Sequence, residues 1–269
     1  MSRPIGVARS EWEGLLPKRK EPSAVPVVVL LGPVGATQAA PVRVTADDGF
    51  DYFIKVQDIF TSVRDRMSVA TEMLVARFGS VIGAPTCDAA IIRIPDELHG
   101  EELRPGIKLD SSYAHGSRAL DHCVEGRDGL QSRTRNSNRQ RHVGVFAIYD
   151  LFYGSDPQWL YDTDNDRSTY SHDHGLYLPP AMNAGWTDQD LQREVGTPRL
   201  LPVPAHGLDQ AELERVAAAL RELSRAQILS VLAEVPQSWN VADTDLEALG
   251  WFLEQRAPAV AGRLDRLRS

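Results

Sequence analysis

The sequence contains few cysteines and no long apolar run. Cys87 and Cys123 are its only thiols, too few for a disulfide framework and without the paired spacing of a zinc site. The longest apolar run, residues 25 to 31, is interrupted by Pro26 and falls far short of the roughly 20 residues that a membrane span needs. These absences argue against a disulfide-stapled fold, a zinc module and a transmembrane segment.

Positive charge is also in short supply. Lys and Arg number 29 against 37 Asp and Glu, which gives a formal net charge of −8 and no general reason to expect nucleic-acid binding. Hydrophobic residues at 42% and charged residues at 25% are ordinary values for a soluble globular protein. The first 22 residues mix Arg, Glu, Trp and Lys without an apolar centre, so we expect no secretory signal and a cytoplasmic location.

The chain begins with a β-rich pattern. Three apolar runs predict strands over 25 to 31, 42 to 45 and 52 to 56. The Asp-Gly step at Asp48-Gly49 is typical of a hairpin turn between the last two. Alternation along the third run places Lys55 on the face opposite Ile54. A lysine in the middle of a strand needs a partner.

A helix is expected next. Apolar positions at helical spacing from 63 to 81, followed by a glycine, predict this helix. Glu72 lies near its apolar face and is the candidate partner for Lys55, because a buried acid usually needs a cation. A strand is expected over 89 to 95. Residues 96 to 142 are polar and Gly-rich and are predicted to form a loop.

The end of this predicted loop is rich in arginine: Arg127, Arg133, Arg135, Arg139 and Arg141. A charge run of this kind is usually solvated. The functional alternative is that residues 127 to 141 form a docking surface for an acidic partner or a phosphate.

The second half of the chain is predicted to be mainly helical. A buried helix over 143 to 153 precedes a hairpin with strands over 158 to 161 and 168 to 172. Further helices are expected over 208 to 223, 225 to 234 and 246 to 267. The change from β-rich to helical predicts an α+β protein of two lobes with a cleft between them. Its expected parts are an N-terminal extension over 1 to 23, a β-rich lobe over 24 to 105 and a helical lobe over 106 to 269.

Two acids flank the predicted hairpin. Asp173 follows the second strand and precedes His174-Gly175, where a turn projects its carboxylate clear of the sheet and suits it to hold a divalent metal. Asp156 precedes the first strand, although an Asp before a Pro can also start a turn. Together they suggest a phosphoryl-transfer site, in which one acid orients a nucleophile and the other carries Mg2+.

Several short motifs along the chain match a family pattern in their order. They are Ala46-Asp-Asp-Gly-Phe-Asp-Tyr-Phe-Ile-Lys55, Glu72 within Ala70-Thr-Glu-Met-Leu-Val-Ala-Arg77, Ile82-Gly-Ala-Pro85, His115-Gly-Ser117, Tyr170-Ser-His-Asp-His-Gly-Leu-Tyr-Leu-Pro179 and Val235-Pro-Gln-Ser-Trp239. In this order they resemble the small HipA-family kinases, a bacterial branch of the protein-kinase-like fold related to the phosphatidylinositol kinases. The resemblance runs from about residue 25 to residue 263.

The resemblance implies a two-lobed kinase that uses ATP and Mg2+ to phosphorylate a hydroxyl of a protein or a small molecule. Lys55 would contact the ATP phosphates, and Glu72 would fix its rotamer through an ion pair. Gly32, Gly35 and Thr37 would lie in the loop that covers the phosphates, where small residues let backbone N–H groups approach the nucleotide.

The resemblance also assigns the two acids. Asp156 would orient the attacking hydroxyl, and Asp173 would bind Mg2+ between the β- and γ-phosphates. The family usually has Arg-His after the first acid and a metal-binding Asn five positions after it. Here those positions hold Pro157-Gln158 and Tyr161, and a phenol with a pKa of about 10 is a poor Mg2+ ligand.

Three residues are candidates to replace the missing Asn: His172, Asp162 and Asn165. If none does so, the chain is expected to be a pseudokinase that acts as a nucleotide-binding or scaffold protein. A third alternative is a metal-dependent hydrolase that uses the same acids on phosphate esters without ATP.

Overall fold

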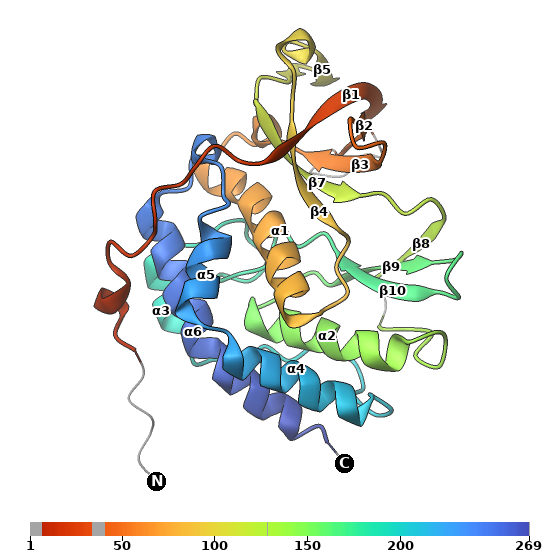
Figure 1. The fold of residues 1–269 in the computed structure, drawn as a ribbon, viewed down its shortest axis with the longest axis vertical. Helices are drawn as coiled ribbons and strands as arrows, with labels where there is room; N and C mark the ends of the chain where they lie inside the picture. The colour runs from red at the N-terminus through yellow and green to blue at the C-terminus, as the bar shows by residue number, and fades with distance from the viewer. Residues whose placement is uncertain (1–6, 34–40, 128, 269) are drawn as a thin grey trace.

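The computed structural model describes residues 7–33, 41–127 and 129–268, and these form a β-rich lobe and a mainly helical lobe (Figure 1). A closed barrel of order β1-β2-β3-β7-β4 builds the first lobe. Its strands are β1 (Ala24–Pro33), β2 (Val42–Ala46), β3 (Asp51–Lys55), β4 (Ala89–Arg93) and β7 (Tyr113–Arg118). A short ribbon of β5 (Glu102–Arg104) and β6 (Ile107–Lys108) extends from it.

The hairpin expected from the Asp-Gly step joins β2 to β3. Val44 pairs with Tyr52 in the antiparallel ladder, and the turn includes Gly49 at a φ of 82°, a conformation that glycine adopts without strain. Residues along β3 alternate between buried and half-buried, so Lys55 projects from the face opposite Ile54, as predicted.

The prediction that residues 96 to 142 form a loop is wrong. This segment contains β5 to β8 and the first turn of a helix. β7 hydrogen-bonds to β3 on one edge and β4 on the other, so its backbone is satisfied whatever its side chains are. Gly116 also has to be small, because a Cβ there would lie 2.6 Å from Cγ1 of Ile92. β7 comes after residue 105, so the barrel strands continue past the lobe boundary expected from the sequence.

Helix α1 (Val63–Ile82) packs against the barrel strands β4 and β7 and also against the helical lobe. It begins where the Ser62 hydroxyl accepts a hydrogen bond from the Asp65 N–H at 3.0 Å. It ends at Gly83, which has a φ of 71°, the left-handed conformation common at helix ends. The helix predicted over 63 to 81 is therefore confirmed, and its central turns are buried on all sides.

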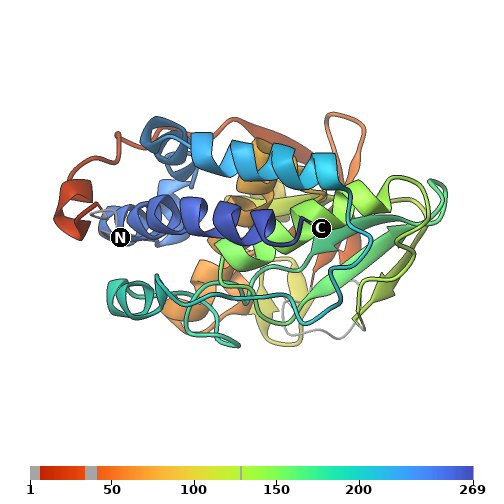
Figure 2. The same ribbon diagram turned by 90° about the horizontal axis from the view of Figure 1, so that it is seen from below.

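The helical lobe contains a sheet of order β10-β9-β8 and five α-helices. The strands are β8 (Cys123–Gly126), β9 (Gln158–Asp162) and β10 (Ser168–His172). The helices are α2 (Asn138–Leu151), α3 (Asp188–Glu194), α4 (Gln210–Glu222), α5 (Arg225–Leu232) and α6 (Asp243–Asp265). α4 and α6 lie side by side (Figure 2). The β9–β10 hairpin matches the expected one within a residue, whereas α3 was not predicted.

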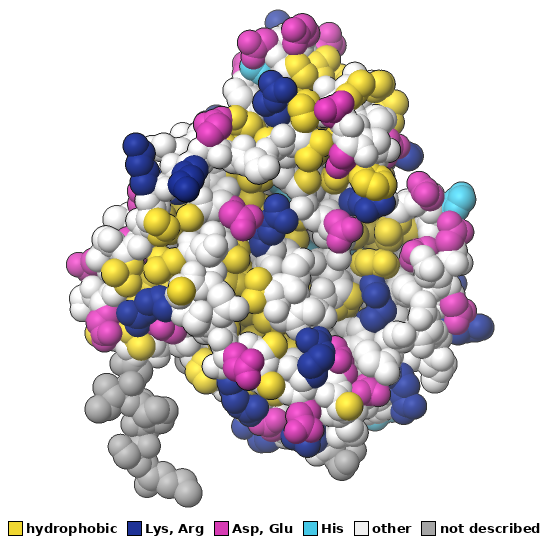
Figure 3. Space-filling view, in the orientation of Figure 1, with side chains coloured by type: hydrophobic (Ala, Val, Ile, Leu, Met, Phe, Trp, Pro, Cys, Tyr) yellow, Lys and Arg dark blue, Asp and Glu magenta, His cyan; other side chains and the backbone are white. Residues whose placement is uncertain are grey.

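Four short 3-10 turns complete the secondary structure of the described residues: η1 (Arg9–Trp12), η2 (Gln57–Ile59), η3 (Asp96–Leu98) and η4 (Gln237–Trp239). The barrel encloses one hydrophobic core, and a larger one lies among the helices and α1. Basic and acidic side chains are interspersed over the face shown in Figure 3. None of the helices in the described parts of the chain is long and apolar enough to cross a membrane.

Residues 7 to 23, here called the N-terminal strap, run along the helical lobe to β1 (Figure 1). Trp12 is fully buried, its ring contacts Gly250 of α6, and its Nε1 donates to Oε2 of Glu254 at 2.7 Å. Nε1 of Trp251 in turn donates to the carbonyl oxygen of Val7 at 2.8 Å. The strap is thus part of the folded core.

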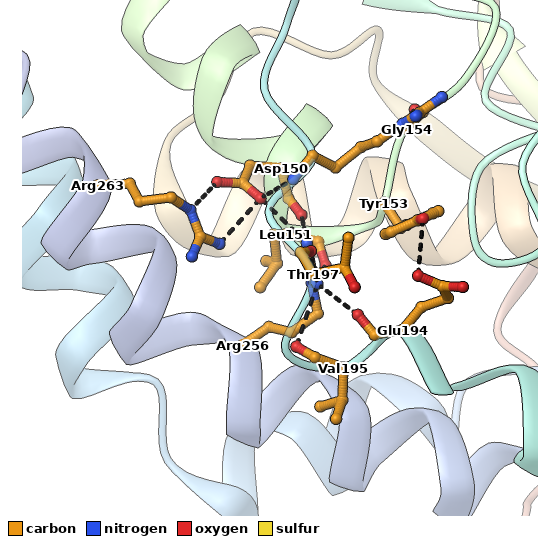
Figure 4. Close-up of polar contacts among 10 residues, drawn as sticks. Asp150, Leu151, Tyr153, Gly154, Glu194, Val195, Thr197, Arg256 and Arg263 are labelled. Carbon is orange, nitrogen blue, oxygen red and sulfur yellow. Dashed lines mark hydrogen bonds and ion pairs between the residues drawn. The ribbon is translucent and has the colours of Figure 1, made fainter. Parts of the chain in front are cut away.

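A buried ionic cluster joins α2, α6 and the segment after α3 (Figure 4). Arg256 of α6 is 1% exposed, and it donates to Oδ1 of Asp150 at 3.0 Å and to the carbonyl oxygen of Thr197 at 2.8 Å. Arg263 donates to the same carboxylate at 2.9 Å. Burial lowers the pKa of Arg256 to about 10, against the opposing charge of Asp150. The cluster lies away from the cleft between the lobes and serves to hold the helices together.

Candidate active site

Lys55, at the end of β3, lies between two carboxylates. Its Nζ forms an ion pair with Oε1 of Glu72 from α1 and another with Oδ1 of Asp173 at 2.6 Å. The pairing of Lys55 with Glu72 was expected from the sequence. The contact with Asp173 brings the turn after β10 to the same cation, so three distant segments meet at one ammonium group.

Glu72 is 3% exposed and is surrounded by donors. Its Oε2 accepts the backbone N–H of His174, and its Oε1 accepts that of Gly175, both at 2.9 Å. A Cβ on Gly175 would lie 3.2 Å from Oε1 of Glu72, so the residue there has to be small for the carboxylate to approach the backbone. Glu72 therefore fixes both Lys55 and the turn that carries Asp173.

The pKa values of Lys55, Glu72 and Asp173 are set by two opposing effects, burial and the charges of their neighbours. Burial alone would lower the pKa of Lys55, but the charges of Glu72 and Asp173 outweigh it and raise that pKa above its ordinary value. Burial would raise the pKa of Asp173, but Lys55 overrides it and holds that pKa well below its usual range. Burial raises the pKa of Glu72, which Lys55 opposes. Lys55 and Asp173 are thus both charged at neutral pH.

Asp156 lies in the turn that leads into β9 and lines the same cleft as residues of α1. It has a φ of 47°, and Asp173 has a φ of 56°, a left-handed conformation that Asp and Asn tolerate better than most residues. Nε2 of Gln158 donates to Oδ2 of Asp156 at 2.9 Å. Lys55, Glu72, Asp156 and Asp173 all line one cleft of about 430 Å³.

The oxygen atoms of the cleft fit a divalent cation held together with phosphates. No group of three or more His, Cys, Asp or Glu in the described ranges could hold a metal by itself. Mg2+ in nucleotide sites usually takes one or two carboxylates, with substrate phosphates and water completing its shell. Asp173 supplies such a carboxylate. Gln158, which is 3% exposed, adds an amide oxygen that has no hydrogen-bond partner among the described residues.

The residue five positions after Asp156 points elsewhere. Tyr161 is buried in β9, and its hydroxyl oxygen accepts the N–H of Gln131 at 2.9 Å. Asp162 and Asn165 hydrogen-bond to each other in the turn between β9 and β10, and neither lines the cleft. Tyr161 is therefore a structural residue of the small sheet.

His172, the third candidate substitute, is half-buried at the end of β10, directly before Asp173. Its Nε2 has no hydrogen-bond partner among the described residues, but it lines a much smaller pocket of about 10 Å³ behind the Lys55 trio. His115 lines that pocket too and reaches Oγ of Ser117 at 3.1 Å. His115 and His172 thus line a small pocket next to the cleft, together with Glu72 and Asp173.

The expected phosphate-covering loop lies mostly outside the described residues, where both Gly35 and Thr37 fall. Gly32 is described. It sits in β1 beside an irregularity in the pairing with β2, with a φ of 111°. It is not among the described residues that line the cleft.

Most of the arginine-rich segment is engaged within the chain. Arg133 and Arg139 donate to carbonyl oxygens of the segment before α4, at 2.8 Å for Pro204 and 2.9 Å for Gly207. Arg141 donates to the carbonyl oxygen of Thr169 at 2.8 Å. The remaining two pair with acids: Arg127 with Glu125, and Arg135 with Asp166. Arg127 alone of this group lines the cleft described above.

A comparison with a solved structure bears on the architecture. The crystal structure of the Helicobacter pylori proinflammatory kinase CtkA is similar with a TM-score of 0.56 and 10% sequence identity, over 91% of this chain and 99% of that one. The chain has a protein-kinase-like fold. The Golgi casein kinase with Mn/ADP bound is similar with a TM-score of 0.44 and 10% identity, over 97% of this chain and 77% of that one. No family model matches the sequence, and no curated protein does.

Gln158 is a cleft residue to which the sequence assigned no role. Its position was noted as a departure from the family pattern, but its proximity to Asp156 depends on how β9 leaves the turn. The alternation along β9 alone could not indicate which face meets the cleft. Gln158 pairs with His172, the residue before Asp173, and this pairing is known only from the folded structure.

Proposed function

We propose that this protein is a HipA-like kinase that transfers the γ-phosphate of ATP to a hydroxyl of a protein or a small molecule, with Mg2+ as the metal. The observation that carries the proposal is the bridging of Glu72 and Asp173 by Lys55 at the wall of a cleft that Asp156 also lines. The fold shared with CtkA, a protein named as a kinase, is consistent with this chemistry.

The proposed roles follow from charge and position. Lys55 would neutralise phosphate charge, and Glu72 would keep its ammonium in place. Asp173 would hold the divalent cation, which supplies charge neutralisation of the phosphates when bound. Asp156 would accept a hydrogen bond from the acceptor hydroxyl and orient it. Such a site accelerates the reaction mainly by positioning and electrostatics.

Thermal unfolding with ATP alone, Mg2+ alone and both together tests nucleotide binding, because a ligand of the folded state raises its stability. We expect the largest rise in Tm with both. Lys55→Met should reduce that rise. Asp156→Asn should keep it and lose ATP turnover, measured as ADP formation with and without added acceptors. Asn suits the left-handed backbone at this position.

The alternatives give different results. A rise in Tm with ATP and Mg2+ but no turnover by the native chain would favour a nucleotide-binding pseudokinase. No rise under any condition would contradict nucleotide binding and leave a scaffold role. Hydrolysis of phosphate esters without ATP would favour the metal-dependent hydrolase. Full turnover by Asp156→Asn would remove Asp156 from the proposed chemistry.

A further inference from the structure

The two polar atoms of the Gln158 amide differ in their bonding: the nitrogen has a hydrogen-bond partner, and the oxygen has none among the described residues. Its Nε2 donates to Oδ2 of Asp156 at 2.9 Å. Its Oε1 is buried and has no hydrogen-bond partner among the described residues, although the side chain lines the cleft. A buried polar oxygen without a partner is uncommon in folded proteins, since leaving it so costs its desolvation. The arrangement indicates that something outside the chain completes the bonding of this oxygen.

The orientation of the amide is set by its neighbours. Asp156 is an acceptor, so the amide presents its NH2 group to that carboxylate and its oxygen elsewhere. Gln158 pairs with His172 across the β9–β10 ladder, and His172 is followed directly by Asp173. Facing residues on adjacent strands have Cβ atoms about 5 Å apart. Gln158 and Asp173 both line the cleft, from neighbouring strand ends.

We infer that Gln158 is a divalent-cation ligand through Oε1, sharing with Asp173 the metal that accompanies the nucleotide. This rests on the proposed function and assigns to Gln158 the place that the sequence pattern would give to residue 161. A neutral amide oxygen is a hard ligand suited to Mg2+ or Mn2+. Since it adds no charge, the site should bind metal well only when the phosphates of a nucleotide supply further oxygen ligands.

A metal-binding measurement separates this role from a purely structural one. Mn2+ can be titrated into the full chain with ADP present and followed by electron paramagnetic resonance, in which bound Mn2+ loses the sharp lines of the free ion. Gln158→Leu, similar in size but without the oxygen, should weaken Mn2+ binding by at least about tenfold, the scale set by the loss of even an outer-shell partner of a metal. The affinity for ADP measured in EDTA should stay within about twofold.

Gln158→Glu tests the oxygen apart from the amide N–H. It supplies a carboxylate oxygen instead of the amide oxygen, loses the donor to Asp156 and adds a negative charge that attracts the cation, so Mn2+ affinity should be kept or increased. If Gln158→Glu loses Mn2+ as Gln158→Leu does, the donor matters and the oxygen is not a ligand. Gln140→Leu, at an exposed glutamine of α2 that reaches Asp209, is the matched control and should bind Mn2+ like the native chain.

The remaining outcomes distinguish this inference from the proposed function. If the native chain with ADP binds Mn2+ and Gln158→Leu binds it equally well, Gln158 is not a ligand, although the kinase proposal stands. If the native chain binds no Mn2+ with ADP, the proposed function fails and this inference fails with it. Should Gln158→Leu not fold, shown by its melting curve without ligand, the result for Gln158→Glu decides.

Discussion

At the scale of single residues, Glu72 holds the cleft together. One carboxylate receives the ammonium of Lys55 and the backbone N–H groups of His174 and Gly175. Glu72→Gln removes the charge and replaces one acceptor oxygen with an NH2 group, which leaves a buried N–H without a partner. We expect a loss of about 1 to 3 kcal/mol in the free energy of unfolding and weaker ATP binding.

Denaturant unfolding and an ATP titration check both parts of this prediction. Glu247→Gln is a suitable control, because Glu247 is also buried and accepts the N–H of Leu16 in the strap, away from the cleft. It should leave ATP affinity unchanged. Equal ATP affinity in native and Glu72→Gln protein would show that Glu72 does not position Lys55 for the nucleotide.

The sequence predicted this pair better than it predicted Gln158. A lysine in a predicted strand and a helical acid each need a partner when buried, so residue type and periodicity were enough to connect Lys55 with Glu72. The sequence could not predict that the side-chain oxygen of Gln158 lacks a partner, because this depends on which face of β9 meets the cleft. Glutamine is common on exposed surfaces, so the residue type alone does not predict that Gln158 is buried.

At the scale of elements, the cluster of Asp150, Arg256 and Arg263 decides how α2 and α6 fit together (Figure 4). Arg256→Leu leaves the buried carboxylate with one cation fewer and five carbonyl oxygens without their donor. We expect a loss of about 3 kcal/mol or more in the free energy of unfolding, the usual cost of breaking a buried ion pair. Arg256→Lys should recover little of it, because an ammonium cannot reproduce the planar set of donors.

Chemical denaturation of both variants measures this cost. Arg221→Leu provides the control: Arg221 pairs with Asp265 at the surface, with its side chain 47% exposed, and such pairs contribute about 0 to 1 kcal/mol. A loss for Arg256→Leu no larger than for the control would mean that the buried cluster adds nothing net to stability.

Elements differed in how well they could be predicted, for local reasons. Local residues determine the β2–β3 hairpin and α1. The hairpin turn has a Gly at a positive φ, and α1 is capped by Ser62 at its start and Gly83 at its end. Local residues do not determine β7, because its Tyr-Ala-His-Gly-Ser-Arg sequence lacks apolar alternation and its pairing depends on strands far along the chain. α3 could have been found from Thr187, whose hydroxyl accepts the N–H of Asp190, a common start of a helix.

At the scale of the whole molecule, buried neutral histidines make the fold sensitive to acid. Burial lowers the pKa of His115, His142 and His174 to about 3 and that of His172 to about 4. Between the unfolded value of about 6.5 and these folded values, the unfolded chain takes up protons that the folded chain does not. Stability is therefore fully present above about pH 6.5 and falls as the pH is lowered.

Each of these histidines should contribute a loss of about 1.4 kcal/mol per pH unit over that interval. Urea unfolding between pH 7.5 and 4.5, at constant ionic strength, measures the slope. His142→Gln should reduce the slope, because one titrating group is removed. A stability that is constant from pH 7 to pH 5 would contradict neutral burial of these side chains.

The N-terminal strap also bears on how the protein is made. Trp12 and its partner Glu254 are 242 residues apart, so during translation the strap has to wait for α6, which is made much later than the strap. Domains usually fold in the order of translation, but this docking cannot precede the synthesis of α6. Until then an indole that becomes fully buried in the folded protein is exposed, and a bulky group placed close to residue 7 would interfere with the docking.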